Sequence, residues 1–407
     1  MEVIKFNDTL VANEKKKLKA IDIMAKNPKK KIRVVSALNS VTNSLINECI
    51  FEEDNKQLNL FVMGVGNVGR KFIEQIHQQN KFLQDNLKIN IRVIGMSNSR
   101  KMCFDESGIA LNDWKSILDT GETANKEAFI STVKKLKLRN SVFVDITANE
   151  AISQTYDQYL SESVAVVSSN KIACSSAYEN YKNLKSLSRK YNAPFLFETN
   201  VGAGLPIIDT LKYLIASGDK VHKIQAVLSG GLNFIFNNFD NYNSFESVVR
   251  DAAVQGFIGS DPKNDLSGID VARKILILIR ESGYQMEIED ITNESFLPYE
   301  CLNTTSTEDF FDSLNIYSSY FENIYNKADS KDCQLKYVAQ FENGKASVGL
   351  KFISSDHPFY NLQGKDNVVM FYTDRYIDQP LLIKGAGAGA SVTASGIFAD
   401  VIRIGNL

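Results

Sequence analysis

With 407 residues, the chain has room for about two or three domains that each contain a sizeable apolar core. Its 46 Lys and Arg residues nearly balance 48 Asp and Glu residues, and the resulting net charge of −2 argues against a nucleic-acid-binding protein. An apolar fraction of 44% with 23% charged residues is ordinary for a globular protein and excludes long disorder or a coiled coil.

Several other classes of protein are also disfavoured. No stretch approaches 18 consecutive apolar residues, and the N-terminal residues include acids and lack the apolar segment of a signal peptide. The five cysteines are dispersed without a CxxC spacing, as expected for reduced thiols, and three histidines argue against a histidine-rich metal site. We therefore expect a cytoplasmic protein with no membrane span and no nucleic-acid partner.

The first 56 residues form a separate segment. Strands are predicted at 3–6 and 32–35, with a lysine-rich helix at 12–24 between them. The acidic, polar residues 52–55 then read as a linker. We interpret 1–56 as a short N-terminal extension.

Alternating strands and helices follow in residues 57–195. The predicted strands are 58–63, 89–94, 141–146 and 164–167. The predicted helices are one that follows the 64–69 glycine loop and runs through residue 79, and two at 126–136 and 151–160. Strands that alternate with helices indicate parallel βαβ units. The fold class is therefore predicted as α/β, with a Rossmann-like doubly wound parallel sheet.

Residues 196–379 have a different pattern, which suits an α+β domain with an open sheet. The predicted strands are 195–198, 222–229, 334–341 and 347–353, and the predicted helices are 206–216, 245–255 and 269–281. A last strand at 380–384, a glycine loop at 385–389 and a helix at 391–402 end the chain. We expect the 380–407 segment to complete the first domain.

The first strand leads into a GxGxxG loop and then a helix, which is the order found in dinucleotide-binding folds. Gly64 allows a tight turn, Gly66 lets a pyrophosphate approach the backbone, and Gly69 lets the helix pack closely on the strand. The helix N-terminus would bind the phosphates. The predicted cofactor-binding residues are Gly64, Val65, Gly66, Asn67, Val68 and Gly69, and the alternative is a plain packing loop.

The end of the second strand bears on which nicotinamide cofactor binds. An acid there would accept from the ribose 2′-hydroxyl of NAD, but residues 97–101 read SNSRK and contain no acid. Arg100 and Lys101 suit a 2′-phosphate, so NADP(H) is favoured over NAD(H). The alternative is that both cations belong to a solvated loop.

Three further charged residues are candidates for catalysis. Lys171 follows a predicted strand at the sheet edge where ligands bind in such folds. Asp270 and Lys274 are spaced i,i+4 on a helix whose other positions are nearly all apolar. A lysine held by a carboxylate can protonate a carbonyl oxygen that receives hydride, whereas the alternative is an ordinary surface ion pair.

Residues 58–407 resemble the homoserine dehydrogenase family, particularly the form fused behind an aspartokinase. The matching motifs, in chain order, are GVGNVG at 64–69, SSNK at 168–171, ETNVGAGLP at 198–206, SGGLNFI at 229–235, DPKNDLSGIDVARK at 261–274 and PLLIKGAGAGASVTASGIFADVIR at 380–403. The resemblance implies a Rossmann-like domain, a substrate and dimerisation domain, and NAD(P)-dependent interconversion of L-homoserine and L-aspartate 4-semialdehyde.

The resemblance also implies roles for individual residues. Lys274 matches the catalytic lysine, Asp270 its partner, Asp261 a residue of the substrate pocket, and Lys171 a second lysine beside substrate and nicotinamide. Thr147 matches a cofactor contact. The loop containing Gly387 would close over the cofactor. A monovalent cation, Na+ or K+, would bind carbonyl groups in the stretch of Glu198, Val201, Ala203 and Leu205.

Two positions depart from the family pattern in the substrate pocket. Gly231 stands where the family usually has a threonine, and Gly259 stands where it has a glutamate expected to hold the substrate ammonium. Loss of a charged hydrogen-bond partner typically costs about 1.5–3 kcal/mol. Substrate binding is therefore expected to be weakened.

The N-terminal segment resembles the start of an aspartokinase. Residues 5–11 read KFNDTLV against the family's KFGGTSV, and residues 34–42 read VVSALNSVT against its VVSA segment. Asn7 and Asp8 replace the glycines of the phosphate loop. We expect a degenerate remnant without kinase activity.

The sequence therefore predicts a homodimeric homoserine dehydrogenase that acts on a small-molecule substrate. The first alternative is a non-catalytic or weakened nucleotide-binding homologue, which Gly231 and Gly259 favour. A second alternative is a dehydrogenase of another small amino aldehyde. Lys171, Asp270 and Lys274 favour the enzyme.

Overall fold

The computed structural model describes the backbone of residues 3–6 and 32–35 and, in full, residues 55–259 and 261–407. The chain divides into two compact units, Met1–Lys56 and Gln57–Leu407. In the first unit, β1 (Val3–Phe6) pairs in parallel with β2 (Ile32–Val35), which confirms the two predicted strands. The helix predicted at 12–24 lies outside the described residues, as do Asn7 and Asp8.

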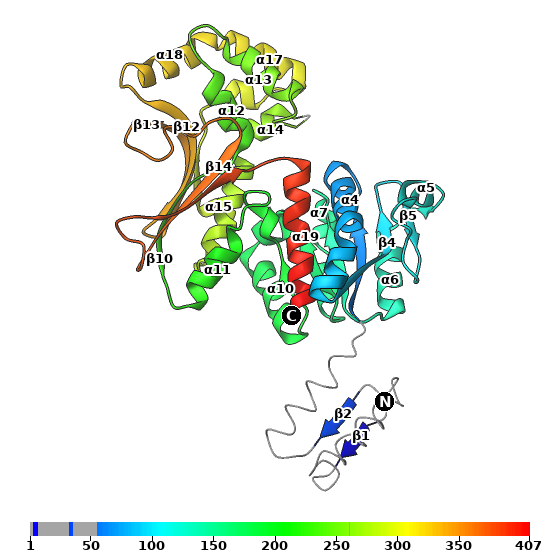
Figure 1. The fold of residues 1–407 in the computed structure, drawn as a ribbon. Coiled ribbons are helices and arrows are strands. Elements are labelled where there is room, and N and C mark those ends of the chain that lie inside the picture. Colours follow the sequence, from blue (N-terminus) through cyan, green and yellow to red (C-terminus); the bar gives the residue numbers. More distant parts are fainter. Residues whose placement is uncertain (1–2, 7–31, 36–54, 260) are drawn as a thin grey trace. The chain divides into compact units, whose positions relative to one another are not determined.

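A seven-stranded sheet forms the first half of the second unit, in the order β6-β5-β4-β3-β7-β8-β9 (Figure 1). Its strands are β3 (Lys56–Met63), β4 (Ile89–Ser97), β5 (Lys101–Phe104), β6 (Glu122–Thr123), β7 (Ser141–Asp145), β8 (Ala165–Ser168) and β9 (Phe195–Leu196). The β3, β7, β8 and β9 pairings are parallel, and β5 and β6 add antiparallel strands at one edge. The strand order reverses at β3, which creates the crevice where ligands bind in doubly wound folds.

Amphipathic helices cover this sheet. They are α4 (Asn67–Phe82), α5 (Trp114–Asp119), α6 (Lys126–Leu136), α7 (Glu150–Ser153), α8 (Tyr156–Leu160), α9 (Ile172–Ser175) and α10 (Tyr178–Lys190). The helix predicted at 151–160 is broken, because the Thr155 hydroxyl donates to the Ile152 carbonyl at 2.7 Å and the backbone turns there. The fold class predicted for this half is confirmed.

A six-stranded sheet forms the other half, in the order β11-β13-β12-β10-β14-β15. Its strands are β10 (Val221–Val227), β11 (Ile291–Glu294), β12 (Gln334–Glu342), β13 (Lys345–Ile353), β14 (Asp366–Thr373) and β15 (Leu381–Ala386). Because β15 pairs with β14, the strand of the 380–407 segment extends this second sheet and not the first. Only α19 (Ala390–Asn406) returns to the first half, where it packs against α4.

Eight of the described helices belong to the half of the unit that contains the second sheet. They are α11 (Ile208–Ala216), α12 (Gly230–Asn238), α13 (Phe245–Val254), α14 (Pro262–Leu266), α15 (Ile269–Glu281), α16 (Tyr299–Leu302), α17 (Thr307–Ile316) and α18 (Ser318–Asp329). The strand predicted at 222–229 ends two residues early, because the Ser229 hydroxyl caps α12 by accepting from the Leu232 N–H at 3.1 Å. None of the described helices is both long and apolar enough to cross a membrane.

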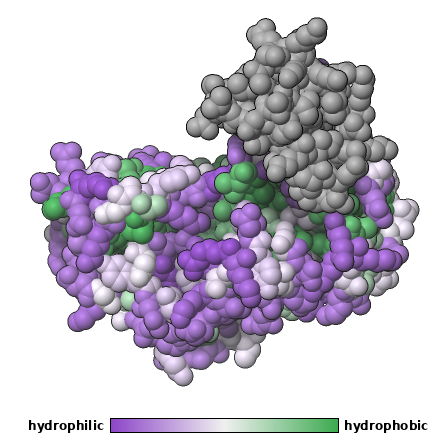
Figure 2. All heavy atoms as spheres, turned by 90° about the horizontal axis from the view of Figure 1, so that it is seen from below, coloured by the Kyte–Doolittle hydropathy of each residue, from purple (hydrophilic) through white to green (hydrophobic). Residues whose placement is uncertain are grey.

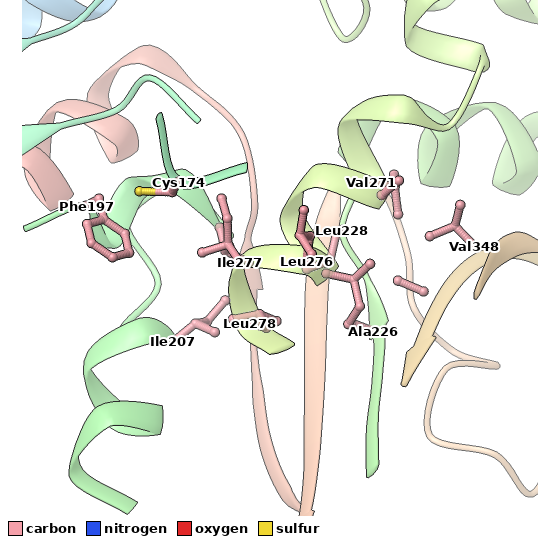
Figure 3. Close-up of a cluster of buried hydrophobic side chains, with 14 of the residues drawn as sticks. Cys174, Phe197, Ile207, Ala226, Leu228, Val271, Leu276, Ile277, Leu278 and Val348 are labelled. Carbon is pink, nitrogen blue, oxygen red and sulfur yellow. The ribbon is translucent and has the colours of Figure 1, made fainter. Parts of the chain in front are cut away.

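Helix α15 joins the two halves through the main apolar core. Its side chains contact the second sheet on one side and the segment after β8 on the other, as Figure 3 shows. The labelled residues are Val271, Leu276, Ile277 and Leu278 of the helix, with Cys174, Phe197, Ile207, Ala226, Leu228 and Val348 around them. The face that Figure 2 shows is by contrast mostly hydrophilic outside the grey atoms.

Candidate active site

The glycine loop between β3 and α4 is shaped for close backbone approach. Gly64 has φ of +100°, and a Cβ there would lie 2.6 Å from the Ile146 carbonyl oxygen. A Cβ on Gly69 would overlap the Gly64 carbonyl group, whereas a Cβ on Gly66 would meet open space. The first turn of α4 carries no acid and has no side-chain cap, so its N–H groups face an approaching anion.

The turn after β4 presents one of the two predicted cations. The Asn98 side chain accepts from the backbone N–H groups of Arg100 and Lys101 at 2.8 and 2.7 Å, which fixes the turn. The Lys101 ammonium donates to the Gly121 carbonyl at 2.9 Å, so its side chain already has a structural partner. Arg100 is exposed at the turn, which makes it the stronger candidate for a 2′-phosphate.

Asp145, which no sequence motif indicated, is a buried carboxylate at the end of β7 that fixes the loops beside the glycine loop. Asp145 ends β7 with no exposed surface and accepts from the Thr147 N–H at 2.8 Å, the Tyr156 hydroxyl at 2.6 Å and the Asn170 amide at 3.1 Å. Burial raises the pKa of Asp145, and these hydrogen bonds oppose that shift. Asp145 therefore holds in place both Thr147, which packs against Gly64, and Asn170, which precedes Lys171.

The three predicted catalytic residues meet at one point. Asp270 receives Lys171 Nζ at 3.4 Å on one oxygen and Lys274 Nζ at 2.7 Å on the other. Lys274 is largely buried and also donates to the Leu228 carbonyl at 2.7 Å. In the described part of the chain these are its two close oxygen partners, so one of its three N–H groups is left for a substrate oxygen. The interpretation as an ordinary surface ion pair does not fit this burial.

The charges of this group control its protonation. Burial opposes ionisation of Asp270, but the ammonium groups of Lys274 and Lys171 outweigh it and hold the pKa of Asp270 well below its usual range. Burial lowers the pKa of Lys274, and Asp270 partly restores it. The carboxylate thus keeps a buried lysine available as a proton donor.

Asp261 and Asp265 take different positions on α14. Asp261 is exposed and caps the helix by accepting from the Asn264 N–H at 3.3 Å. Asp265 is more enclosed and accepts from the Gly259 N–H at 2.5 Å. Its pKa is raised by burial and by the charges of Asp270 and Asp261, while Lys274 lowers it. Asp265, which is not among the residues predicted from the sequence, is therefore the acid of α14 that interacts with the lysine group.

The two departures from the family pattern lie next to each other. A Cβ on Gly231 would lie 2.6 Å from the Phe257 carbonyl oxygen and 2.7 Å from the Ile258 side chain. A Cβ on Gly259 would meet only an oxygen of Asp265, at 3.2 Å. The 257–259 loop thus occupies the space of a side chain at 231, so the two changes are coupled in the structure.

This packing makes a stability prediction. Gly231→Thr should lower the free energy of unfolding by about 1–3 kcal/mol, because the new side chain must displace the 257–258 backbone. Gly66→Ala is the matched control, since its Cβ meets no neighbour, and thermal denaturation without cofactor compares the two. Equal melting temperatures for Gly231→Thr and wild type would show that the 257–259 loop moves freely.

The turn after β9 has the features of a carbonyl-rich site. Gly202 and Ala203 have φ of +75° and +54°, which turns successive peptide groups sharply. The Glu198 carboxylate accepts from the Ile208 and Asp209 N–H groups at 2.6 and 2.9 Å, and burial raises its pKa. It therefore caps α11 (Ile208–Ala216). No cluster of three or more His, Cys, Asp or Glu side chains able to hold a metal occurs among the described residues, so a cation in this turn would have to bind backbone carbonyl groups.

Comparison with known proteins agrees with this architecture. Residues 64–198 match the family model described as "Homoserine dehydrogenase, NAD binding domain", and residues 206–402 match "Homoserine dehydrogenase". A homoserine dehydrogenase of Schizosaccharomyces pombe is 34% identical over 358 residues, which cover 85% of this chain and 95% of the relative. A bifunctional aspartokinase/homoserine dehydrogenase 1 of Arabidopsis thaliana is 40% identical over 347 residues, which cover 84% of this chain. The match covers 38% of that bifunctional relative.

Solved structures show the same fold. A Candida auris protein titled as of unknown function superposes with a TM-score of 0.77 at 32% identity, covering 86% of this chain and 98% of its own. A hyperthermophilic archaeal homoserine dehydrogenase in complex with NADPH gives 0.66 at 24% identity, covering 86% and 97%. With both halves of the chain matched and the predicted resemblance confirmed, the chain belongs to the homoserine dehydrogenase family.

Proposed function

We propose that this chain catalyses NAD(P)-dependent interconversion of L-homoserine and L-aspartate 4-semialdehyde. The observation that carries the proposal is the Lys171–Asp270–Lys274 group, which lies where α15 joins the glycine-loop sheet to the second sheet. A nicotinamide cofactor, when bound, supplies or accepts the hydride. The glycine loop and the uncapped N-terminus of α4 fit its phosphates.

The side chains then divide the work. Lys274 Nζ donates a proton to the aldehyde oxygen as that oxygen gains negative charge, and Asp270 with the Leu228 carbonyl fixes the direction of the ammonium. Lys171, on the other oxygen of Asp270, positions the substrate at the boundary with the cofactor. Asp265 and Asp261 supply negative charge for the substrate ammonium, and the charges of Asp270 and Lys274 act on Asp265.

We further propose that the cofactor is NADP(H), with Arg100 as the residue that selects it. Arg100→Ala should weaken NADPH binding about tenfold while leaving NADH binding within about twofold, because only NADPH carries the 2′-phosphate. Fluorescence titration of both cofactors measures this, with Lys101→Ala as the control whose ammonium serves Gly121. Tighter NADH than NADPH binding by the wild type would contradict the proposed preference.

Three finer assignments belong to this proposal, and the first two of them rest on the resemblance. The turn containing Val201 and Ala203 would bind Na+ or K+ through carbonyl groups, which its sharp backbone geometry supports. The protein would form a homodimer. A cytoplasmic location is supported by the free thiols of Cys103, Cys174, Cys301 and Cys333.

The second candidate function is a nucleotide-binding homologue with little turnover, which Gly231 and Gly259 favour because they alter one patch of the substrate pocket. Oxidation of NADPH in the presence of aspartate semialdehyde, followed by absorbance, separates the two functions. Homoserine formation in step with NADPH loss supports the enzyme. NADPH binding without turnover, in buffers with and without K+ or Na+, supports the homologue.

A further inference from the structure

The side-chain amide of one fully buried asparagine beside the site has no hydrogen-bond partner in the part of the chain that the structure describes. Asn367 lies on β14 with no exposed surface, and neither atom of its side-chain amide has a partner within the described residues. A buried polar group left unpaired destabilises the folded protein, so such groups are rare and require an explanation.

Its position links it to Lys274. The antiparallel register pairs Val227 with Val368, which brings Asn367 next to Leu228 along the sheet. The Leu228 carbonyl accepts from Lys274 at 2.7 Å. Asn367 also shares the face of β14 on which Val369 and Phe371 join the core around α15. The unpaired amide therefore lies on the same side of the sheet as the lysine group.

The other neighbour of Asn367 is the second glycine loop, residues 385–389. Gly385 pairs with Asn367 across β15 and β14, and a Cβ on Gly387 would overlap the Asn367 amide. The peptide backbone at 387 therefore covers that amide directly. Only glycine leaves room for this contact.

The loop also reaches the cofactor half. It leads into α19, whose Ser391 carbonyl accepts from the Gln75 side chain of α4 at 3.0 Å. The N-terminus of α19 follows Gly389, has no side-chain cap and carries no acid in its first turn. The loop thus runs from Asn367 in the second sheet to the helix that follows the first glycine loop.

We propose that Asn367 is a positioning residue that holds the Gly385–Gly389 loop in its cofactor-bound arrangement. In the structure the amide is buried and has no hydrogen-bond partner among the described residues. In the bound form, a small shift of the loop lets peptide groups near Gly387 donate to and accept from the amide. Pairing of the amide would then favour the bound form, and the proposal rests on the proposed function because NADP(H) is the ligand.

Asn367→Leu tests this, because leucine has a similar shape and no polar atoms. The cofactor-free variant should melt about 2 °C higher than wild type, since an unpaired amide is removed. Its NADPH dissociation constant should rise about tenfold, since the bound form loses its hydrogen bonds. A structural role alone would move both properties in the same direction.

Asn233→Leu is the matched control for the free protein. Asn233 is also fully buried, but its amide donates to the Gly364 carbonyl at 3.0 Å and accepts from Lys336 at 3.3 Å. This variant should melt below wild type. Asn367→Ala, which adds no volume against Gly387, should show the same loss of NADPH affinity as Asn367→Leu.

The outcomes separate the proposals. A lower melting temperature for cofactor-free Asn367→Leu would show that the amide is already paired in the free protein, for instance with water, and would contradict this proposal. Unchanged NADPH affinity in both Asn367 variants would contradict it as well, while leaving the proposed function intact. If the wild type binds neither NADPH nor NADH, the proposed function is wrong and the role of Asn367 falls with it.

Discussion

Lys274→Ala should lower kcat by a factor of about 10² to 10⁴ while changing NADPH affinity little. The ammonium lies 2.7 Å from Asp270 and 2.7 Å from the Leu228 carbonyl, and we propose its remaining N–H group as the proton source for the substrate oxygen. Alanine removes that proton source. The glycine loop that we propose as the cofactor site stays unchanged.

Two measurements accompany this variant. Steady-state kinetics with aspartate semialdehyde gives kcat, and fluorescence titration with NADPH shows whether the cofactor site remains. Lys263→Ala is the control, because the Lys263 ammonium donates from α14 to the Thr304 carbonyl and lies outside the lysine group. A kcat for Lys274→Ala within a few-fold of wild type would rule out Lys274 as the proton donor.

The pH dependence of the same reaction tests the role of Asp270. Burial lowers the pKa of Lys274 and the Asp270 carboxylate raises it again, so Asp270→Asn should lower that pKa further. The reduction of the aldehyde needs a protonated lysine, so its rate falls as pH rises through this pKa. The falling limb of the kcat profile should therefore move to lower pH in Asp270→Asn. A limb that stays in place would show that another group titrates.

Much of the site was predictable because its signals are local in the sequence. The helix at 269–281 begins and ends where its apolar periodicity predicts, so the i,i+4 spacing of Asp270 and Lys274 is preserved. The GVGNVG loop likewise needs only the strand before it and the helix after it. Lys171 follows the C-terminal end of β8, and the fold brings it to Asp270 although the two residues are distant in the sequence.

The parts that could not be predicted depend on contacts distant in the sequence. Asp145 belongs to no sequence motif. Its structural role depends on hydrogen bonds from Tyr156 and Asn170, which are brought close to it only by the fold. We expected residues 380–407 to complete the first domain, and α19 does pack there. The strand of this segment instead pairs with β14, because its pairing is set by tertiary packing and not by its own sequence pattern. Helix α12 begins with two glycines, which are poor helix formers, so the sequence pattern there favours the end of a strand.

Gly259→Glu should raise kcat/KM for the amino-acid substrate by about 10-fold to 200-fold, equivalent to about 1.5–3 kcal/mol. Gly259 does not have a positive φ, so a side chain at this position causes no backbone strain. A Cβ there would meet only Asp265, at 3.2 Å. The new carboxylate would thus enter the pocket beside Asp265, near Lys274. A substrate ammonium between two carboxylates gains a charge-assisted hydrogen bond in an enclosed site.

The control for Gly259→Glu must separate the effect of the new charge from the effect of the new side chain's shape. Gly259→Gln has almost the same shape and no charge, so it should recover little of the gain. The Gly259→Glu variant should bind homoserine more tightly than wild type. Its melting temperature without substrate should not rise, because the new carboxylate repels that of Asp265 when no ammonium lies between them. A robust wild-type rate that Gly259→Glu leaves unchanged would mean that Asp265 already anchors the ammonium. In that case Asp265→Asn should raise KM for homoserine by about tenfold or more, and the change at Gly259 would be a compensated loss.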